Sequence, residues 1–377
     1  MIDFIFVADD PEGWHEENME RNRAHYSFVA ALGPAAVAAA AGGIGAGVWF
    51  NTLVPLEGRV IKYGVIGRAA FLDDMATWCH LYVPGRLHKP VLPLVDLGGG
   101  GGGGGAAAGA ARLAAAVAAN RAAALRAALL LSPPEAELRD VVRRVAGLSY
   151  QGDVRMGLAE DSRKVERIVE GSWPGFCEAY LPLLMQGAGG GGGAGVTVEG
   201  GAALAARLEE YRRTHALAAA PSGRWVPRAA RAAAAAAGGA GGAWPRVVVR
   251  QDASAEARVA QIAALPACLL QRIADRAGVR RPWAAAAALA APLAPAGAAA
   301  AWPESELAAA AAGWRRDVAR AAVKSGRHEA LIHAGLRGII RASSARQAAV
   351  GVLSAGLAKS ARYLGAKLAK AWRPRPR

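Results

Sequence analysis

Apolar side chains dominate both faces of the strand predicted at the start of the chain, residues 2–8. Ile2, Phe4 and Phe6 would share one face, and Asp3 would share the other face with apolar neighbours. A lone buried carboxylate is costly unless a cation or hydrogen bonds compensate it. We therefore expect either an exposed strand end at Asp3 or a positively charged group that meets its side chain.

Short helices and strands follow this first strand. Pro11 can begin a helix with a polar face. Residues 48–66 read as two strands joined by a turn at Glu57 and Gly58, because apolar and polar residues alternate on both sides of that turn. The pattern predicts a β-hairpin.

The next segment predicts a short helix capped in the region of Asp73 and Asp74, then a turn rich in Pro and Gly, then a further strand. The turn carries Arg86, His88 and Lys89. Mixed elements of this kind indicate an α+β fold for the first part of the chain.

Helical patterns dominate the remainder. The predicted helices cover residues 112–131, 134–146, 160–169, 207–215 and 265–274, with a C-terminal series from residue 314. Between them lie tracts that are nearly pure Ala and Gly and lack the large side chains of a packed core. We interpret these tracts as insertions; they cover residues 98–105, 187–195, 229–243 and 284–301.

Charge adds more to this picture than hydrophobicity does. The chain has 377 residues, a net charge of +15 and a pI near 10.4, which favours an anionic partner: nucleic acid, nucleotide or acidic lipid. Residues 28–50 carry no charge over a length that could cross a bilayer. Pro34 and a cluster of glycines interrupt them, however, so no transmembrane span is expected.

Cysteine and histidine spacing excludes the common zinc motifs. Cys79, Cys177 and Cys268 stand far apart with no CxxC pair, which fits packing residues in a reducing compartment. His15 and His25 favour surface or hydrogen-bonded roles, and the absence of an HExxH motif argues against a zinc hydrolase.

Three positions hold a charged side chain in a strand or turn: Asp3, Lys62, and the pair Asp153 and Arg155. Singly each has an ordinary explanation, since a strand lysine often extends to solvent and a Gly-Asp-x-Arg turn often forms a local ion pair. Together they offer a carboxylate for a divalent metal, a cation for phosphate oxygens and a second charged pair. Phosphoryl or nucleotidyl transfer requires these groups.

Several strings, taken as an ordered set, resemble the mitochondrial phosphatidate cytidylyltransferases, the translocator assembly and maintenance family. They are "MIDFIFVADDPEGWHEENMERNRAHYSFVAALGP", "GAGVWFNTLVPLEGRVIKYGVI", "LYVPGRLHKPV", "AGLSYQGDVRM", "AEDSRKVERIV" and "GLRGIIRASSARQ". The resemblance implies a nucleotidyltransferase-like domain followed by a mainly helical, winged-helix-like domain. It also implies the reaction of CTP with phosphatidic acid to give CDP-diacylglycerol and pyrophosphate, a step toward cardiolipin.

The resemblance makes Asp3 the ligand of a catalytic Mg²⁺. In the family, a Gly-Ser-Gly loop that cradles the nucleotide phosphates precedes this aspartate. We therefore expect that loop, with a transit peptide, upstream of Met1 in a longer natural chain, so that the domain here is N-terminally truncated. Position 5 is Ile rather than a carboxylate, which leaves the second metal ligand open, with Asp153 as a guess.

The same resemblance suggests which residues handle the nucleotide. Lys62, with Arg155 and Lys164, would neutralise phosphate charge, while Asn51 and Tyr63 would orient the nucleotide. A phosphatidate oxygen would attack the α-phosphorus of CTP in line, without a covalent enzyme intermediate.

The predicted organisation has six parts. They are a nucleotidyltransferase-like domain (1–96), a Gly/Ala-rich insertion (97–111), a helical winged-helix-like domain (112–220), a low-complexity Ala/Gly region (221–260), a C-terminal helical region (261–347) and a basic amphipathic tail (348–377).

The tail places Leu353, Leu357, Leu364 and Leu368 near one helical stripe, with basic residues largely off it. This pattern predicts a helix lying on an anionic lipid surface, peripheral to the matrix side of the inner mitochondrial membrane. A solvated basic helix packed on its own domain is the alternative. Two other functions stay open: a basic membrane- or nucleic-acid-binding protein without catalysis, and a nucleotidyltransferase with another acceptor such as RNA, although no nucleic acid is expected.

Overall fold

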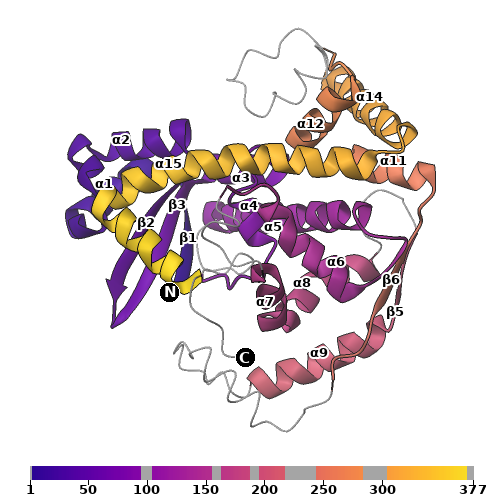
Figure 1. Ribbon diagram of the computed structural model, residues 1–377, viewed down its shortest axis with the longest axis horizontal. Helices are drawn as coiled ribbons and strands as arrows, with labels where there is room; N and C mark the ends of the chain where they lie inside the picture. Colours follow the sequence, from indigo (N-terminus) through magenta and orange to yellow (C-terminus); the bar gives the residue numbers. More distant parts are fainter. Residues whose placement is uncertain are drawn as a thin grey trace.

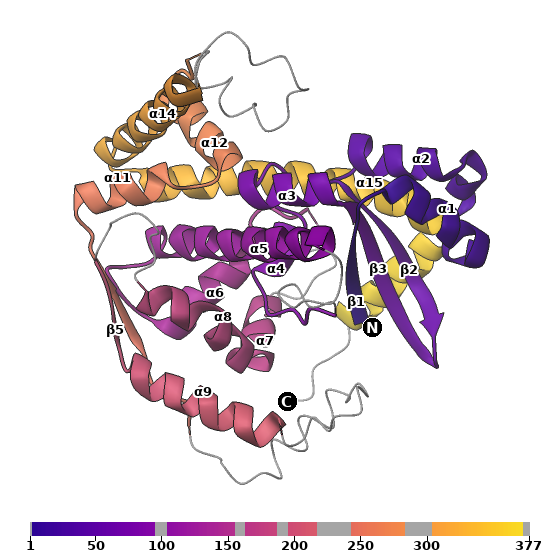
Figure 2. The ribbon, with the colours of Figure 1, turned by 180° about the vertical axis from the view of Figure 1, so that it is seen from behind.

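Two small sheets lie at opposite ends of a mainly helical body (Figures 1 and 2). The computed structural model describes residues 2–94, 104–154, 163–186, 195–216, 243–282 and 304–371. The mixed α+β class predicted from the sequence is confirmed.

The N-terminal sheet has three strands in the order β1-β3-β2: β1 (Ile2–Ala8), β2 (Val48–Leu56) and β3 (Arg59–Gly67). β1 is parallel to β3, and β2 pairs with β3 as an antiparallel hairpin. The turn falls at Glu57 and Gly58, whose φ angles of 46° and 71° are those of a tight hairpin turn. The predicted strand and hairpin are therefore confirmed.

Short helices cover one face of this sheet: α1 (Pro11–Arg21), η1 (Arg23–His25), η2 (Phe28–Leu32), α2 (Pro34–Ala39) and η3 (Ala40–Ile44). α1 begins at Pro11, as predicted, and the Asp10 carboxylate caps it by accepting two backbone N–H groups. The uncharged residues 28–50 are divided among η2, α2, η3 and β2, so they form no single long helix.

Helices α3 (Arg68–Thr77), α4 (Pro84–Leu87) and α5 (Gly104–Leu130) cover the other face. Two predictions for this region are wrong. Asp73 and Asp74 lie inside α3 rather than at its cap, because the helix continues directly from β3, and the Asp74 carboxylate accepts the N–H groups of His80 and Leu81 at 2.8 and 3.1 Å. The predicted turn after α3 contains helix α4, and the described residues 91–94 form no strand.

α5 confirms the helix predicted at 112–131. Within the part of the chain that the structure describes, its segment Ala108–Leu130 is long and apolar enough to cross a membrane by length and composition alone. The same helix packs against α3 and α6, and Leu125 and Leu129 are buried in the largest core cluster.

The second sheet is antiparallel, in the order β4-β6-β5, and its strands come from distant segments: β4 (Glu135–Glu137), β5 (Val196–Glu199) and β6 (Val248–Gln251). Around it lie α6 (Leu138–Gly147), η4 (Leu148–Tyr150), α7 (Lys164–Gly171), α8 (Trp173–Met185) and α9 (Gly201–Ala216). Two predictions are corrected here. The helix predicted at 134–146 begins with a strand, and β6 lies inside the predicted low-complexity region, because its valines pair with both neighbours.

The C-terminal helices are α11 (Ala255–Ala263), α12 (Ala267–Ala277), α14 (Glu304–Lys324) and α15 (His328–Ala371). α15 runs along the molecule from α12 to β2 (Figure 1). Its Gln347 side chain accepts the N–H of Ala46 and donates to the carbonyl of Val48. These bonds fix the C-terminal helix to the N-terminal sheet.

The cysteine prediction is wrong for two of the three residues. Cys79, after α3, and Cys268, on α12, form a disulfide with their Cα atoms 5.1 Å apart. Cys177 is buried and unpaired, as predicted.

Candidate functional site

The strand register places Asp3 directly beside Lys62. The two residues are Cα partners in the parallel pair of β1 and β3, and they share the sheet face that packs against α3, α4 and α5. Asp3 is exposed near the start of β1, so the expectation of an exposed strand end is confirmed. A carboxylate and an ammonium group are thus held on adjacent strands about 5 Å apart at the backbone.

Three further cations gather near Lys62 and form, with it, what we call the cationic cluster: Lys62, Arg86, Lys89 and Lys164. Lys62 Nζ lies 4.1 Å from the centre of the Phe50 ring, and Arg86 Cζ lies 5.2 Å from the same ring. Aromatic faces attract cations, so Phe50 helps to hold both charges in place.

A second ring holds the other half of the cationic cluster. Lys89 Nζ and Lys164 Nζ lie 4.6 and 4.8 Å from the centre of the Tyr150 ring. Lys89 also donates to the Ser149 hydroxyl at 2.6 Å and to the carbonyl of Gly85. Because Ser149 and Tyr150 belong to η4, the cationic cluster lies where η4 meets α4.

Two glycines permit this close assembly. A Cβ on Gly64 would lie 2.5 Å from the Phe50 ring, and one on Gly85 would lie 2.3 Å from the Cβ of Ser149. Any side chain at these positions would displace Phe50 or η4.

The charge on Lys89 is disfavoured where it stands. Burial lowers the pKa of Lys89 well below its ordinary value, and the nearby cations Arg86 and Lys164 lower it further. An anion bound among these side chains would favour the charged form of Lys89 and so oppose this shift. A buried lysine crowded by like charges is therefore typical of a site for a phosphate-bearing ligand.

The structure brings together some predicted site residues and separates others. Asp3, Lys62 and Lys164 lie at or beside the cationic cluster. Asp153 is buried in the turn after η4, and its backbone N–H donates to the carbonyl of Tyr150. Arg155 lies outside the described residues.

Asn51 and Tyr63 point to the opposite face of the sheet. The Tyr63 hydroxyl accepts hydrogen bonds from Asn51 and Asn18, each at 2.9 Å, and therefore donates its proton to His25 Nδ1 at 2.8 Å. Asn51 also accepts the indole N–H of Trp49. Their role in orienting the nucleotide stays a prediction, and the described bonds give them a structural role.

His15 confirms the expectation of a hydrogen-bonded histidine. Its Nδ1 lies 2.8 Å from the hydroxyl of Tyr26, and burial lowers the pKa of His15 to about 4, so the ring is neutral near pH 7.

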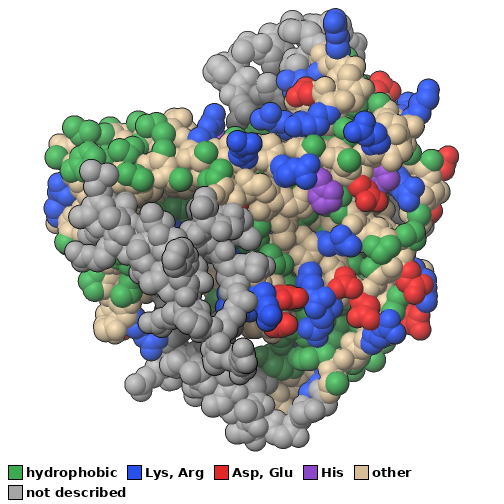
Figure 3. Space-filling model, in the orientation of Figure 1, with side chains coloured by type: hydrophobic (Ala, Val, Ile, Leu, Met, Phe, Trp, Pro, Cys, Tyr) green, Lys and Arg blue, Asp and Glu red, His purple; other side chains and the backbone are tan. Residues whose placement is uncertain are grey.

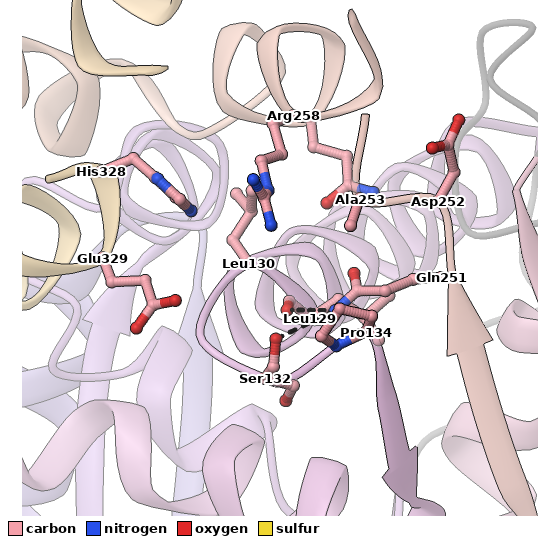
Figure 4. Close-up of a pocket in the computed structure, with 11 residues that line it drawn as sticks. Leu129, Leu130, Ser132, Pro134, Gln251, Asp252, Ala253, Arg258, His328 and Glu329 are labelled. Carbon is pink, nitrogen blue, oxygen red and sulfur yellow. Dashed lines mark hydrogen bonds between the residues drawn. The ribbon is translucent and has the colours of Figure 1, made fainter. Parts of the chain in front are cut away.

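A small cavity at the far end of α5 is too small for a nucleotide, at about 10 Å³. Figure 4 shows Arg258, His328 and Glu329 around it, with Gln251 donating to the carbonyls of Leu129 and Ser132. Both signs of charge line it, so it offers no concentrated anion site.

Sequence reasoning did not single out Arg86 and Lys89 as members of the cationic cluster. Both stand in the string "VPGRLHKP", which carries three basic residues in four positions after a turn. This concentration of basic residues could have indicated an anion-binding site. Their proximity to Lys62 was not predictable from sequence, because it depends on the packing of α4 over Phe50.

Asp3 is the candidate metal ligand beside the cationic cluster. Among the described residues, no group of three or more His, Cys, Asp or Glu side chains could hold a metal ion. Asp3 offers a single exposed carboxylate, which suits Mg²⁺ because phosphates and water supply its other ligands.

Comparison with known proteins defines the class first. The family model described as "Phosphatidate cytidylyltransferase, mitochondrial" matches residues 1–191 and 217–370, which makes the chain a nucleotidyltransferase. The chain belongs to the mitochondrial phosphatidate cytidylyltransferase family. Its function, as a member of that family, is that of a phosphatidate cytidylyltransferase.

Individual relatives agree. The phosphatidate cytidylyltransferase of Danio rerio is 30% identical over 99% of this chain and 84% of the relative. Those of Xenopus laevis and Homo sapiens are 37% and 38% identical over 49% of this chain, and the matches cover 52% and 39% of the relatives. The matched part of the chain thus spans about half or less of these two relatives.

Proposed function

We propose that the cationic cluster binds the triphosphate of CTP while phosphatidate attacks the α-phosphorus. The observation that carries this proposal is the convergence of four cationic side chains over two aromatic rings, beside an exposed carboxylate. A triphosphate carries three to four negative charges, and neutralising them as the leaving group separates is the main catalytic task in such a transfer.

The proposed reaction is an in-line displacement at the α-phosphorus of CTP. A phosphate oxygen of phosphatidate forms a bond to the α-phosphorus as the bond to the β-phosphate oxygen breaks. The products are CDP-diacylglycerol and pyrophosphate. Lys62 and Arg86, on the sheet side, and Lys89 and Lys164, on the η4 side, would hold the departing phosphates from two directions.

Asp3 would hold a magnesium ion at the sheet edge of the cationic cluster. When bound, Mg²⁺ would neutralise part of the negative charge on the nucleotide phosphates. Lys62 lies beside Asp3 on the neighbouring strand, so a metal ion at Asp3 and the ammonium group of Lys62 would both face the nucleotide phosphates. Asp153 is the candidate for a second carboxylate.

We also propose that the protein lies peripherally on the matrix side of the inner mitochondrial membrane. Phe28, Leu32, Ile44 and Val352 are large apolar residues exposed by 44–72%, and apolar side chains gather over this end of the molecule (Figure 3). The Ser27 hydroxyl donates to the carbonyl of Leu353, so this apolar surface adjoins the start of the basic tail.

The two features suit an anionic bilayer, because the apolar side chains would insert at the bilayer surface and the basic tail would attract the anionic head groups. α15 is helical to Ala371, and the side chains of residues 355–371 lie outside the described residues. Vesicle sedimentation tests this: Phe28→Ser with Leu32→Ser should release the chain from phosphatidate vesicles. Unchanged binding would contradict a role for this apolar surface, and no vesicle binding by the parent chain would favour a basic tail packed on its own domain.

One assay tests the catalytic proposal. The full chain is incubated with labelled CTP, Mg²⁺ and vesicles containing phosphatidate, and labelled lipid is extracted. Asp3→Asn should lower turnover about 100-fold or more. Asp9→Asn is the matched control, because it removes an exposed carboxylate just past the other end of β1, where Asp9 pairs with Arg68 at 2.6 Å.

The outcome separates the rival functions. The proposal is supported if the Asp3→Asn variant forms no labelled lipid while the Asp9→Asn variant forms it normally. Vesicle or RNA binding without a CTP-dependent product would indicate a non-catalytic binding protein. Label transferred to RNA in place of lipid would indicate another acceptor.

A further inference from the structure

A second concave site lies on the helical side of η4, away from the cationic cluster. It is a cavity of about 400 Å³ between α6, η4 and α15, with residues at its walls that no step above uses. They are Leu131, Arg144, Gly147, Gln151, His333 and Arg337.

Positive charge dominates this cavity. Arg144 and Arg337 are exposed, and within the described residues neither side chain forms an ion pair or a hydrogen bond. No carboxylate is among the described residues that line the cavity. On the face drawn in Figure 3, Lys, Arg and His side chains gather over the part of α15 that runs above α6.

A hydrogen bond orients the polar groups between the two arginines. His333 Nδ1 lies 2.8 Å from Gln151 Oε1, so the imidazole donates and its Nε2 faces away from that bond. The Gln151 oxygen is thereby occupied, and the amide N–H₂ group is left as the donor of that side chain. Arg337 and Arg144 both lower the pKa of His333, after burial, while Glu329 raises it.

The spacing between η4 and α15 is set by the backbone. Gly152 has a φ of +81°, and a Cβ there would lie 3.0 Å from the carbonyl oxygen of Arg337. This approach holds Gln151 against His333 and fixes one wall of the cavity. The site is therefore shaped by rigid elements before any ligand arrives.

We propose that this cavity binds a phosphate group, held by the guanidinium groups of Arg144 and Arg337 with the Gln151 amide as a further donor and His333 beside it. Guanidinium groups match phosphate oxygens in charge and geometry, and a concave cationic site concentrates anions. Free phosphate and the head group of an anionic phospholipid share this chemistry. The proposal is independent of where CTP binds.

η4 would connect the two sites. Ser149 and Tyr150 contact Lys89 and Lys164 of the cationic cluster, and Gln151, the next residue, contacts His333 in the cavity. A phosphate bound in the cavity would therefore restrain the segment that helps to hold the cationic cluster.

The test follows the imidazole NMR signals of His333 in the full chain during a titration with inorganic phosphate. The signals are assigned by their loss in His333→Gln. Arg144→Gln with Arg337→Gln should weaken the phosphate affinity at least tenfold. The matched control is Arg143→Gln with Arg341→Gln, which removes the same charge from the same two helices outside the cavity and should change the affinity less than twofold.

Competition experiments with two kinds of vesicle distinguish a lipid head group from soluble phosphate as the ligand of the cavity. Competition by phosphatidate vesicles but not by phosphatidylcholine vesicles would assign the cavity to a lipid head group, and no competition by either would assign it to soluble phosphate. If the double variant folds poorly, Arg337→Gln alone should weaken binding at least threefold. Equal phosphate affinity in the cavity variants and the control, or His333 signals that do not respond to phosphate, would overturn the proposal.

Discussion

Replacement of Lys89 by methionine separates a ligand-binding role from a structural one. Lys89 Nζ is buried among cations and donates to Gly85 and Ser149. Methionine keeps the length of the side chain and removes the charge. The Ser149 hydroxyl lies 3.4 Å from the Gly85 carbonyl oxygen, so each of these groups keeps a hydrogen-bond partner in the variant.

The expected stability change is therefore small. Removing a disfavoured buried charge offsets the loss of its two hydrogen bonds, and the free energy of unfolding should fall by no more than about 1 kcal/mol. CTP binding should respond differently. Loss of one charge-assisted hydrogen bond to a phosphate costs about 1.5–3 kcal/mol, which weakens the affinity roughly 10- to 100-fold.

Calorimetric titration of CTP and thermal melting measure these two effects separately. Lys324→Met is the control, because Lys324 is an exposed lysine at the end of α14. Lys89→Met should bind CTP weakly and melt within a few degrees of the parent chain. A variant that binds CTP normally but melts much lower would refute the reasoning, since Lys89 would then be a structural residue.

Three other predictions concern stability. Asn51→Ala should lower the free energy of unfolding by about 1–3 kcal/mol, measured by urea denaturation, because it leaves the buried Tyr63 hydroxyl and Trp49 indole short of a partner; no change would refute the network. Burial raises the pKa of Asp74 to about 6, so its contribution to stability should fall as the pH rises from about 4 to 6, and Asp74→Asn should flatten that slope. Reduction of the disulfide, which closes a separation of 189 residues, should lower the melting temperature, whereas Cys79→Ser should make melting insensitive to reductant.

The sequence predicted elements that depend on local patterns. Alternation located β1 and the hairpin, and the same two-residue period places Lys62 and Tyr63 on opposite faces of β3, as the structure has them. Asp74 was misplaced because a carboxylate near a helix looks like a cap in sequence. In the structure the Asp74 carboxylate accepts the backbone N–H of His80, which follows the end of α3.

The candidate site was only partly predictable. Asp3 and Lys62 could be named from their strands, but their pairing needed the parallel register. Arg86 and Lys89 join Lys62 only because Phe50 packs over Gly64 and η4 packs over Gly85. The pairing of Cys79 with Cys268 likewise depends on tertiary structure, since spacing alone does not reveal it.

The structure of the full chain with CTP and Mg²⁺ tests the central claim most directly. We expect the triphosphate among Lys62, Arg86 and Lys89, with the metal within coordination distance of Asp3. A triphosphate bound elsewhere on the chain, with these side chains unchanged, would contradict the account.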